Sequence, residues 1–172
     1  MHHASGALAA LAFIAMSPTS ANPQQLMRLA VDLAHANRLQ GGRPFGAVLA
    51  RGNEVIATGV NEIIASHDPS THAEMQALRA GTRKRANPSL AGLSIYASGH
   101  PCPMCLAALV MNGAEQVFFA FDNRDAAPYG LSSEGSYQRL RLPLTPPPLP
   151  ITRIDTGIRA AQLYGDEAWP AA

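Results

Sequence analysis

Two short motifs carry the residue types and the spacing of a hydrolytic metal site. The tripeptide HAE at 72–74 places an imidazole two residues from a carboxylate, and PCPMC at 101–105 holds the only two cysteines of the chain. One histidine and two thiolates can hold Zn²⁺ and leave its fourth position open to water, which zinc activates. A free carboxylate beside such a site is suited to carrying protons. The predicted ligands of one Zn²⁺ per chain are His72, Cys102 and Cys105, with Glu74 as the proton carrier.

The spacing of the two cysteines supports the same interpretation. Cys102 and Cys105 are three positions apart, which puts both sulfurs on one side of a helical turn. Pro103, between them, suits the first position of a helix. Two cysteines at this spacing, without any other motif, could also form a redox motif or be two structural cysteines. The upstream HAE tripeptide favours a metal site over both.

Two alternatives stay open on the residues alone. Thr71 and Glu74 form the T-x-x-E pattern of a capping box, in which the carboxylate faces the backbone of its own helix. His100 lies two residues before Cys102, and as a fourth ligand it would turn the site into a structural one. The following Pro101 favours an extended backbone at this point. Each alternative demands a different geometry from catalysis.

The elements expected around the motifs alternate between helices and strands after an opening hairpin. A helix is expected over 23–39, because Pro23 suits a first turn and Gly41-Gly42 stops it. The strands are expected over 44–51, 54–60, 93–98 and 116–121, and two further helices over 71–86 and 103–112. This order indicates an α/β domain with a mixed sheet and helices on its faces. It places His72 and both cysteines near helix N-termini.

The C-terminal part gives weaker signals, and the N-terminal part gives ambiguous ones. A short helix over 129–140, a proline-rich connection over 142–150, an edge strand over 151–155 and a last helix over 158–169 are expected. Residues 6–16 form an apolar run before a small-residue stretch, as in a signal peptide, yet no Lys or Arg precedes it. A start-site artefact fits this run equally well. We therefore expect an N-terminal extension over 1–22 and one domain, which carries both metal motifs, over 23–172.

Composition restricts the class of protein and of partner. With 172 residues, 47% hydrophobic and 15% charged, the chain is expected to form one compact domain. Thirteen Lys and Arg against twelve Asp and Glu leave no basic excess, which mildly favours a small-molecule substrate over nucleic acid. The apolar run over 6–16 is too short for a membrane span. Two cysteines at metal-ligand spacing suit the reducing cytoplasm, with secretion as the minority expectation.

With these residues in view, the chain resembles the cytidine-deaminase-like superfamily, and within it the guanine deaminase and nucleoside deaminase branch. The similarity spans 44–121 and includes PFGAV at 44–48, Asn61, and DPSTHAE at 68–74 besides the cysteine motif. The pattern H-x-E followed by P-C-x-x-C is the signature of zinc-dependent base deaminases. The resemblance implies a three-layer α/β/α fold around a mixed five-stranded sheet, and a homodimer. Residues near the C-terminus are expected to close the pocket.

The resemblance also implies roles for single residues. His72, Cys102 and Cys105 become the zinc ligands and Glu74 the proton shuttle. The implied substrate contacts are Asn61 to the ring, Phe45 packed against the ring, the backbone N–H of Ala73, and Glu134 as a second carboxylate. Each has a plainer alternative: a turn residue for Asn61, a core position for Phe45, and an exposed helical carboxylate for Glu134. Related enzymes commonly have Glu where this chain has His100.

The activity that the resemblance implies is zinc-dependent hydrolytic deamination of an amino-substituted purine or related heterocycle, within purine metabolism. Guanine is the first candidate, and ammonia is released. A transfer-RNA adenosine deaminase shares the metal motifs but needs a basic surface and a pocket for a flipped nucleotide. A cytosine or cytidine deaminase also stays open. The non-enzyme alternative is a catalytically silent zinc scaffold, which would not require the carboxylate of Glu74.

Overall fold

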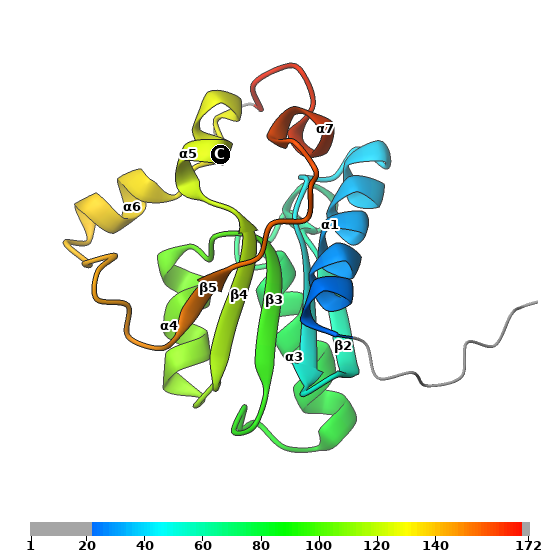
Figure 1. Ribbon diagram of the computed structural model, residues 1–172, viewed down its shortest axis with the longest axis vertical. Helices are drawn as coiled ribbons and strands as arrows, with labels where there is room; N and C mark the ends of the chain where they lie inside the picture. Colours follow the sequence, from blue (N-terminus) through cyan, green and yellow to red (C-terminus); the bar gives the residue numbers. More distant parts are fainter. Residues whose placement is uncertain (1–21, 170–172) are drawn as a thin grey trace, which may run out of the picture.

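A mixed five-stranded sheet runs through the middle of the molecule, in the order β2-β1-β3-β4-β5 (Figure 1). The computed structural model describes residues 22–169. Its strands are β1 Gly46–Arg51, β2 Glu54–Val60, β3 Ser94–Gly99, β4 Gln116–Phe121 and β5 Ile151–Arg153. Strand β1 pairs antiparallel with β2 and β3, whereas β3, β4 and β5 are parallel. The predicted mixed sheet of five strands is confirmed.

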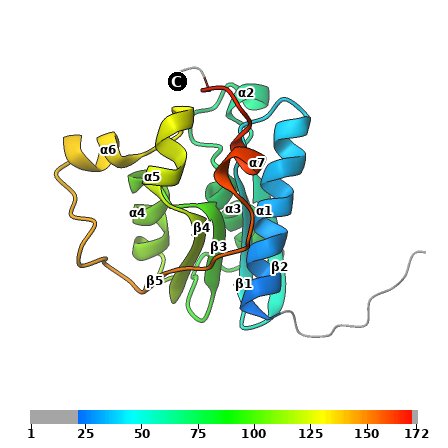
Figure 2. The same ribbon diagram turned by 45° about the horizontal axis from the view of Figure 1, so that its top comes forward.

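Helices cover both faces of this sheet. They are α1 Pro23–Leu39, α2 Ile63–Ser66, α3 Ala73–Arg85, α4 Pro103–Met111, α5 Asn123–Ala126, α6 Glu134–Arg139 and α7 Ala160–Tyr164, with the 3₁₀ helix η1 Ala127–Tyr129. Helices α1 and α7 lie side by side on one face, and α3 and α4 pack on the other (Figure 2). The expected three-layer α/β/α fold is therefore confirmed.

Two hydrophobic cores separate these layers, because successive side chains of a strand point to opposite faces. On β1, Val48 packs toward α1 with Leu26, whereas Leu49 packs toward α3 and α4 with Leu109. All four side chains are fully buried. Burial of each large apolar side chain contributes roughly 1.5–3 kcal/mol. The cores thus hold α3 and α4, which carry the two motifs, against one face of the sheet.

A glycine allows the closest approach between β2 and α3. A Cβ atom on Gly59 would lie 2.3 Å from the backbone oxygen of Ala73, the first residue of α3. Real Cβ atoms do not approach backbone this closely. Gly59 therefore sets how near the first turn of α3 lies to the edge strand, and with it the depth of His72 and Glu74.

The elements of the central region lie close to their expected bounds. The helix over 23–39 and the strands over 54–60 and 116–121 have the expected bounds. The helix expected over 71–86 begins later, at Ala73, and its C-cap Ala86 adopts φ 49°. The short helix α2 was not expected. The later start of α3 makes Glu74 its second residue, and this position determines whether its carboxylate can form a capping box.

The C-terminal region departs further from expectation. The helix expected over 129–140 is shorter, because a 3₁₀ turn precedes it and α6 begins only at Glu134. The last helix spans five residues instead of the expected 158–169, since Gly165 adopts φ 91° and ends it. Strand β5 is an edge strand as expected, with three residues. The apolar run over 6–16 lies outside the described residues.

Within residues 22–169, no helix combines the length and the apolar character that a membrane crossing requires.

Candidate metal centre and active site

Two helix starts bring the predicted ligands together. His72 is the N-cap residue of α3, with φ −67° and ψ 155°, and Cys102 is the N-cap residue of α4, with φ −72° and ψ 168°. Both therefore have the extended backbone that is usual at this position. Pro103 occupies the first position of α4 as expected, and Cys105 lies within the same first turn. The two helices pack side by side, so their first turns meet.

The three donor atoms fit one zinc ion. His72 Nδ1 lies 3.5 Å from Cys102 Sγ and 3.6 Å from Cys105 Sγ, and the two sulfurs are 3.6 Å apart. A tetrahedral zinc with Zn–S of about 2.3 Å and Zn–N of about 2.0–2.1 Å requires separations of ~3.6 Å between nitrogen and sulfur and ~3.8 Å between sulfurs. Both cysteines are free thiols. The donor set and its geometry match a zinc site with three protein ligands.

Electrostatics in the cluster favour a thiolate. Hydrogen bonding from Cys105, assisted by His72 and opposed by burial, lowers the pKa of the Cys102 thiol to about 4. The contact with Cys102 in turn raises the pKa of His72. The thiolate is the form that binds zinc, and a bound cation favours deprotonation further. The protein groups themselves therefore prepare one ligand for the metal.

The Glu74 carboxylate lies beside the zinc donors, with hydrogen-bond contacts to Cys105 and to its own backbone N–H. Because α3 begins at Ala73, Glu74 is its second residue and cannot occupy the third position that a capping box requires. The Thr71 hydroxyl instead donates to the Asp68 carbonyl at 2.7 Å. Burial, with the nearby Cys102 as the next cause, raises the pKa of Glu74 to about 7. The capping-box alternative is therefore wrong, and a carboxyl with this pKa suits proton transfer near neutral pH.

His100 does not belong to the donor set. Among the described residues, the metal-binding group comprises only the three predicted ligands. The Nδ1–H of His100 donates to the Pro101 carbonyl at 3.0 Å, which fixes the tautomer because a carbonyl can only accept. The imidazole ring packs edge-on against Phe119 and Tyr137. The alternative of a four-ligand structural site finds no support in this geometry.

Asn61 serves the turn after β2 with only part of its side chain. Its Oδ1 accepts from the N–H of Ile63 at 3.2 Å, and its backbone N–H donates to the Phe45 carbonyl at 3.1 Å. The residue is buried. Within residues 22–169, no hydrogen bond occupies its Nδ2 group, so the turn role does not use up the amide.

Phe45 and Ala73 lie at the same end of the sheet. The half-buried Phe45 ring contacts both cores and lies 6.2 Å from the ring of Tyr164. Ala73 is buried at the first position of α3, where a backbone N–H has no partner within its helix. The core role of Phe45 is thus observed, and a contact with substrate stays a prediction.

Glu134 lies apart from the zinc donors. It is the first residue of α6 and is exposed. Its side chain lines a hollow of about 200 Å³ together with His100, Asp122 and Leu144. The exposed position agrees with the plainer alternative from sequence.

Sequence reasoning missed the residues that hold the loop before His72. Asp68 Oδ1 accepts from both the N–H and the hydroxyl of Ser70, each at 2.7 Å. Arg79 Nη2 donates to the same Ser70 hydroxyl at 2.9 Å. The local signal was the Asp-Pro-Ser sequence, which is typical of a side-chain-stabilised turn. The partner Arg79, one to two turns along α3, had no such signal.

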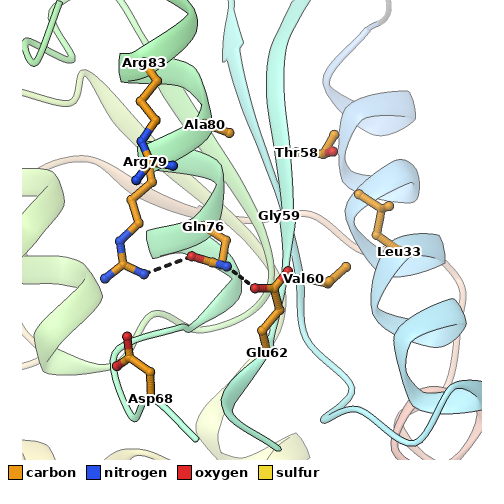
Figure 3. A pocket seen from close by; sticks show the side chains of 10 residues that line it. All are labelled: Leu33, Thr58, Gly59, Val60, Glu62, Asp68, Gln76, Arg79, Ala80 and Arg83. Carbon is orange, nitrogen blue, oxygen red and sulfur yellow. Dashed lines mark hydrogen bonds between the residues drawn. The ribbon is translucent and has the colours of Figure 1, made fainter. Parts of the chain in front are cut away.

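A larger hollow lies elsewhere. It measures about 660 Å³ and borders the edge strand β2 between α1 and α3 (Figure 3). Gln76 bridges Arg79 and Glu62 along its wall, accepting from the first and donating to the second. None of the zinc donors or Glu74 lines it. This hollow is therefore separate from the metal centre.

Fold and site together define a class: a zinc-dependent hydrolytic deaminase with its ligands at two helix starts. Residues 20–121 match the family model described as the cytidine and deoxycytidylate deaminase zinc-binding region, and the chain belongs to this family. The resemblance inferred from sequence is confirmed, as is the zinc cofactor. The chain is accordingly an enzyme, an aminohydrolase that acts on C–N bonds.

Individual relatives are consistent with this assignment. The chain is 33% identical to guanine deaminase from Bacillus subtilis over 134 residues, which covers 77% of this chain and 86% of the relative. It is 34% identical to a tRNA-specific adenosine deaminase from Buchnera aphidicola, covering 60% of this chain and 64% of that one. The X-ray structure of the B. subtilis guanine deaminase superposes with a TM-score of 0.68 at 34% identity, over 75% and 83% of the two chains.

Proposed function

We propose that this enzyme deaminates a free purine base or a related amino-substituted heterocycle, with guanine as the first candidate. The carrying observation is the similarity to a guanine deaminase over most of both chains, at 33% identity. The donor set and the buried Glu74 supply the chemistry that such a reaction needs. Water replaces the exocyclic amino group, so that the products are the oxo heterocycle and ammonia.

His72, Cys102 and Cys105 hold the zinc ion in this proposal. Zinc, when bound, supplies a Lewis acid that activates water for attack on the amino-bearing ring carbon. The Glu74 carboxylate accepts a proton from the attacking water and delivers protons to the ring nitrogen and to the leaving amine. Its burial within the cluster keeps bulk water from competing for these protons. Burial raises the pKa of its carboxyl, which favours the protonated form that delivers a proton.

Three further groups are proposed to orient the substrate ring. The Nδ2 group of Asn61 and the backbone N–H of Ala73 are donors for acceptor atoms of the ring. The Phe45 ring supplies an apolar surface for its face. Hydrogen-bonding groups at fixed positions can reject an analogue that lacks the matching atom by a large factor.

Glu134 is proposed as a second proton carrier at the rim of the site. It shares a hollow of about 200 Å³ with His100, two residues from the ligand Cys102. Its exposed carboxylate can exchange protons with solvent. This role is independent of that of Glu74.

A transfer-RNA adenosine deaminase is the second candidate. The similarity to such enzymes at 34% identity over 103 residues supports it. The chain spans 64% of that relative's length, and its charge of thirteen basic against twelve acidic residues gives little attraction for phosphates. A cytosine or cytidine deaminase ranks third, supported by the family description alone.

We propose that the enzyme is a homodimer that uses the outer face of α4. Met104 and Met111, which are 37% and 83% exposed, are seven positions apart and lie on one side of the helix, and Val110, 40% exposed, lies next to Met111. An apolar stripe of this kind is typical of a protein interface. Met111→Glu should give a monomer by sedimentation, whereas a dimer that persists would place the interface elsewhere.

The free thiols of Cys102 and Cys105 support the cytoplasm as the compartment.

Ammonia release tests the proposed substrate class. The zinc-loaded protein is assayed with guanine, adenine, cytosine, guanosine, cytidine, adenosine and unmodified transfer RNA, and Glu74→Gln serves as the blank. Release that depends on Glu74 from a free purine supports the proposal. Activity on transfer RNA alone would reverse the ranking, and zinc binding without any release would favour the silent scaffold.

A further inference from the structure

The carbonyl oxygen of Pro101 accepts two side-chain hydrogen bonds. The Tyr137 hydroxyl donates to it at 2.7 Å, and His100 Nδ1 donates to it at 3.0 Å. A carbonyl oxygen has two lone pairs, so both of its acceptor positions are used. We call these three groups, the Pro101 carbonyl, the His100 imidazole and the Tyr137 hydroxyl, the Pro101 clamp.

The clamp acts on the peptide plane that leads into Cys102. The Pro101 carbonyl and the Cys102 N–H belong to one planar peptide unit. Once two donors hold the oxygen, that plane can no longer rotate, and the Cα atom of Cys102 is held with it. On the other side, the backbone N–H of His100 donates to the Phe121 carbonyl at 2.8 Å, which ties the loop to β4. The loop that leads into the first ligand of the PCPMC motif is therefore held at two points, His100 and Pro101.

Tyr137 reaches this loop from a distant element, whose other residues are half-buried or exposed. It lies 36 residues after Pro101, and it is the only buried residue of the six-residue helix α6. The side chain is 2% exposed, and its ring also packs edge-on against His100. The contact therefore both anchors α6 and restrains the metal loop.

We infer that Tyr137 is a positioning residue of the metal centre, whose hydroxyl holds the peptide plane before Cys102 and so keeps Cys102 Sγ within the donor group. The inference rests on the zinc site of the proposed function. It goes beyond that function because Tyr137 is not a member of the donor group and acts through the Pro101 carbonyl. Partners that orient metal ligands commonly change metal affinity by 10–100-fold when they are removed.

Tyr137→Phe tests the inference because it removes only the hydroxyl. Tyr164→Phe is the matched control: Tyr164 is equally buried, and within residues 22–169 its hydroxyl has no hydrogen-bond partner. The zinc-loaded full chain is mixed with excess chromogenic chelator, and zinc release is followed over time. We expect release from Tyr137→Phe to be roughly tenfold faster than from the wild type, with Tyr164→Phe unchanged. Equal rates for the two Phe variants would overturn the inference.

Two further measurements separate positioning from plain stability. With Co²⁺ in place of zinc, the thiolate absorption bands should shift in Tyr137→Phe and not in Tyr164→Phe. His100→Phe removes the other donor and keeps an aromatic ring beside Phe119, so the double variant should release zinc faster than either single one. A lowered melting temperature with unchanged zinc release and cobalt spectrum would show that the hydroxyl only stabilises the fold, which overturns the inference.

The outcomes also distinguish this inference from the proposed function. If the wild type binds no zinc, the proposed function fails before any variant is compared. If the wild type binds zinc and releases ammonia while Tyr137→Phe behaves as the wild type, the inference alone is wrong.

Discussion

Two pairs of helices in this protein, α1 with α5 and α3 with α4, begin in different ways. Helix α1 starts with a capping box between Asn22 and Gln25, and α5 starts with one between Asp122 and Asp125. Helices α3 and α4 have the same extended backbone at the N-cap, but His72 and Cys102 make no side-chain hydrogen bond to their own first turns. The positions that normally stabilise a helix start are here given to metal donors. Helices α3 and α4 therefore lack a side-chain N-cap, because the N-cap residue of each is a predicted zinc ligand.

Other contacts replace the missing caps. Before α3, Asp68 and Ser70 form a turn that Arg79 ties to the helix body. Before α4, the Pro101 clamp holds the backbone and Pro103 presets the first turn. The capping boxes of α1 and α5 act within one helix, whereas the starts of α3 and α4 depend on neighbouring elements.

The largest expected effect comes from removing a ligand at an uncapped start. Cys102→Ala should lose most of its zinc, all measurable deamination, and several degrees of melting temperature, because metal binding is coupled to folding. Zinc content per chain and thermal melting measure this. The matched control is Asn22→Ala, a change at a capped start, which should keep its zinc. Full zinc content in Cys102→Ala would show that Cys102 is not a zinc ligand, and the start of α4 would then not differ from that of α1 in this respect.

The second effect separates chemistry from folding at the start of α3. Glu74→Gln keeps the shape of the side chain and the three donors, so zinc content and melting temperature should stay close to those of the wild type. Turnover should fall by roughly 10³-fold, since proton transfer by a positioned group contributes 10²–10⁴-fold. Ammonia release under saturating substrate measures it. Turnover near the wild-type rate would be incompatible with a proton-carrying role.

A smaller effect is expected at the capped start of α5. Asp122→Ala should lower the free energy of unfolding by about 1 kcal/mol at neutral pH, as is typical of N-cap removal. Burial raises the Asp122 pKa, but hydrogen bonds from Asp125 and Arg124 outweigh it and lower the pKa below its ordinary value of 3.8.

The sign of this pKa shift adds a pH test. A lowered carboxyl pKa contributes stability above the ordinary value, and the contribution is lost as the pH falls through the folded-state pKa. The penalty of Asp122→Ala should therefore shrink in acid. Urea unfolding at about pH 7 and about pH 3 measures both values. A penalty that grew in acid would contradict the assigned ionic cap.

The smallest effect is expected at Asn22, which is exposed at the start of α1. Asn22→Ala should lower the free energy of unfolding by about 0.5–1 kcal/mol, with unchanged zinc content and turnover. Urea denaturation of the zinc-loaded protein detects a change of this size. If zinc content fell as well, capped and uncapped starts would be coupled more closely than the structure indicates.

Elements with strong local signals were predictable from sequence. The bounds of the helix over 23–39 follow from Pro23 and Gly41-Gly42, which act within a few residues of the helix ends. The C-terminal helices were less predictable, because their positions depend on distant contacts. Tyr137 is buried by Pro101 and His100, more than thirty residues earlier, and no local pattern indicates that.

The candidate site was predictable in its donors and less so in their surroundings. His72, Cys102 and Cys105 follow from residue type and spacing alone. The direction of Glu74 depends on whether α3 begins at Thr71 or at Ala73, a difference of two residues that sequence patterns do not resolve. The role of His100 depends on which acceptor its ring meets, and that acceptor is the carbonyl next to it in the chain.

The separation of the donors along the chain has a further consequence, for the unfolded protein. A metal ion that joined residue 72 to residues 102 and 105 would close a ring of the chain that contains both α3 and β3. In an unfolded chain that keeps the ion, a cross-linked loop of about thirty residues lowers the entropic free-energy gain of unfolding by an amount on the order of 4 kcal/mol. The chain has only two cysteines, both free, so this ring takes the place of a disulfide. A chelator, and not a reductant, is the reagent that opens it.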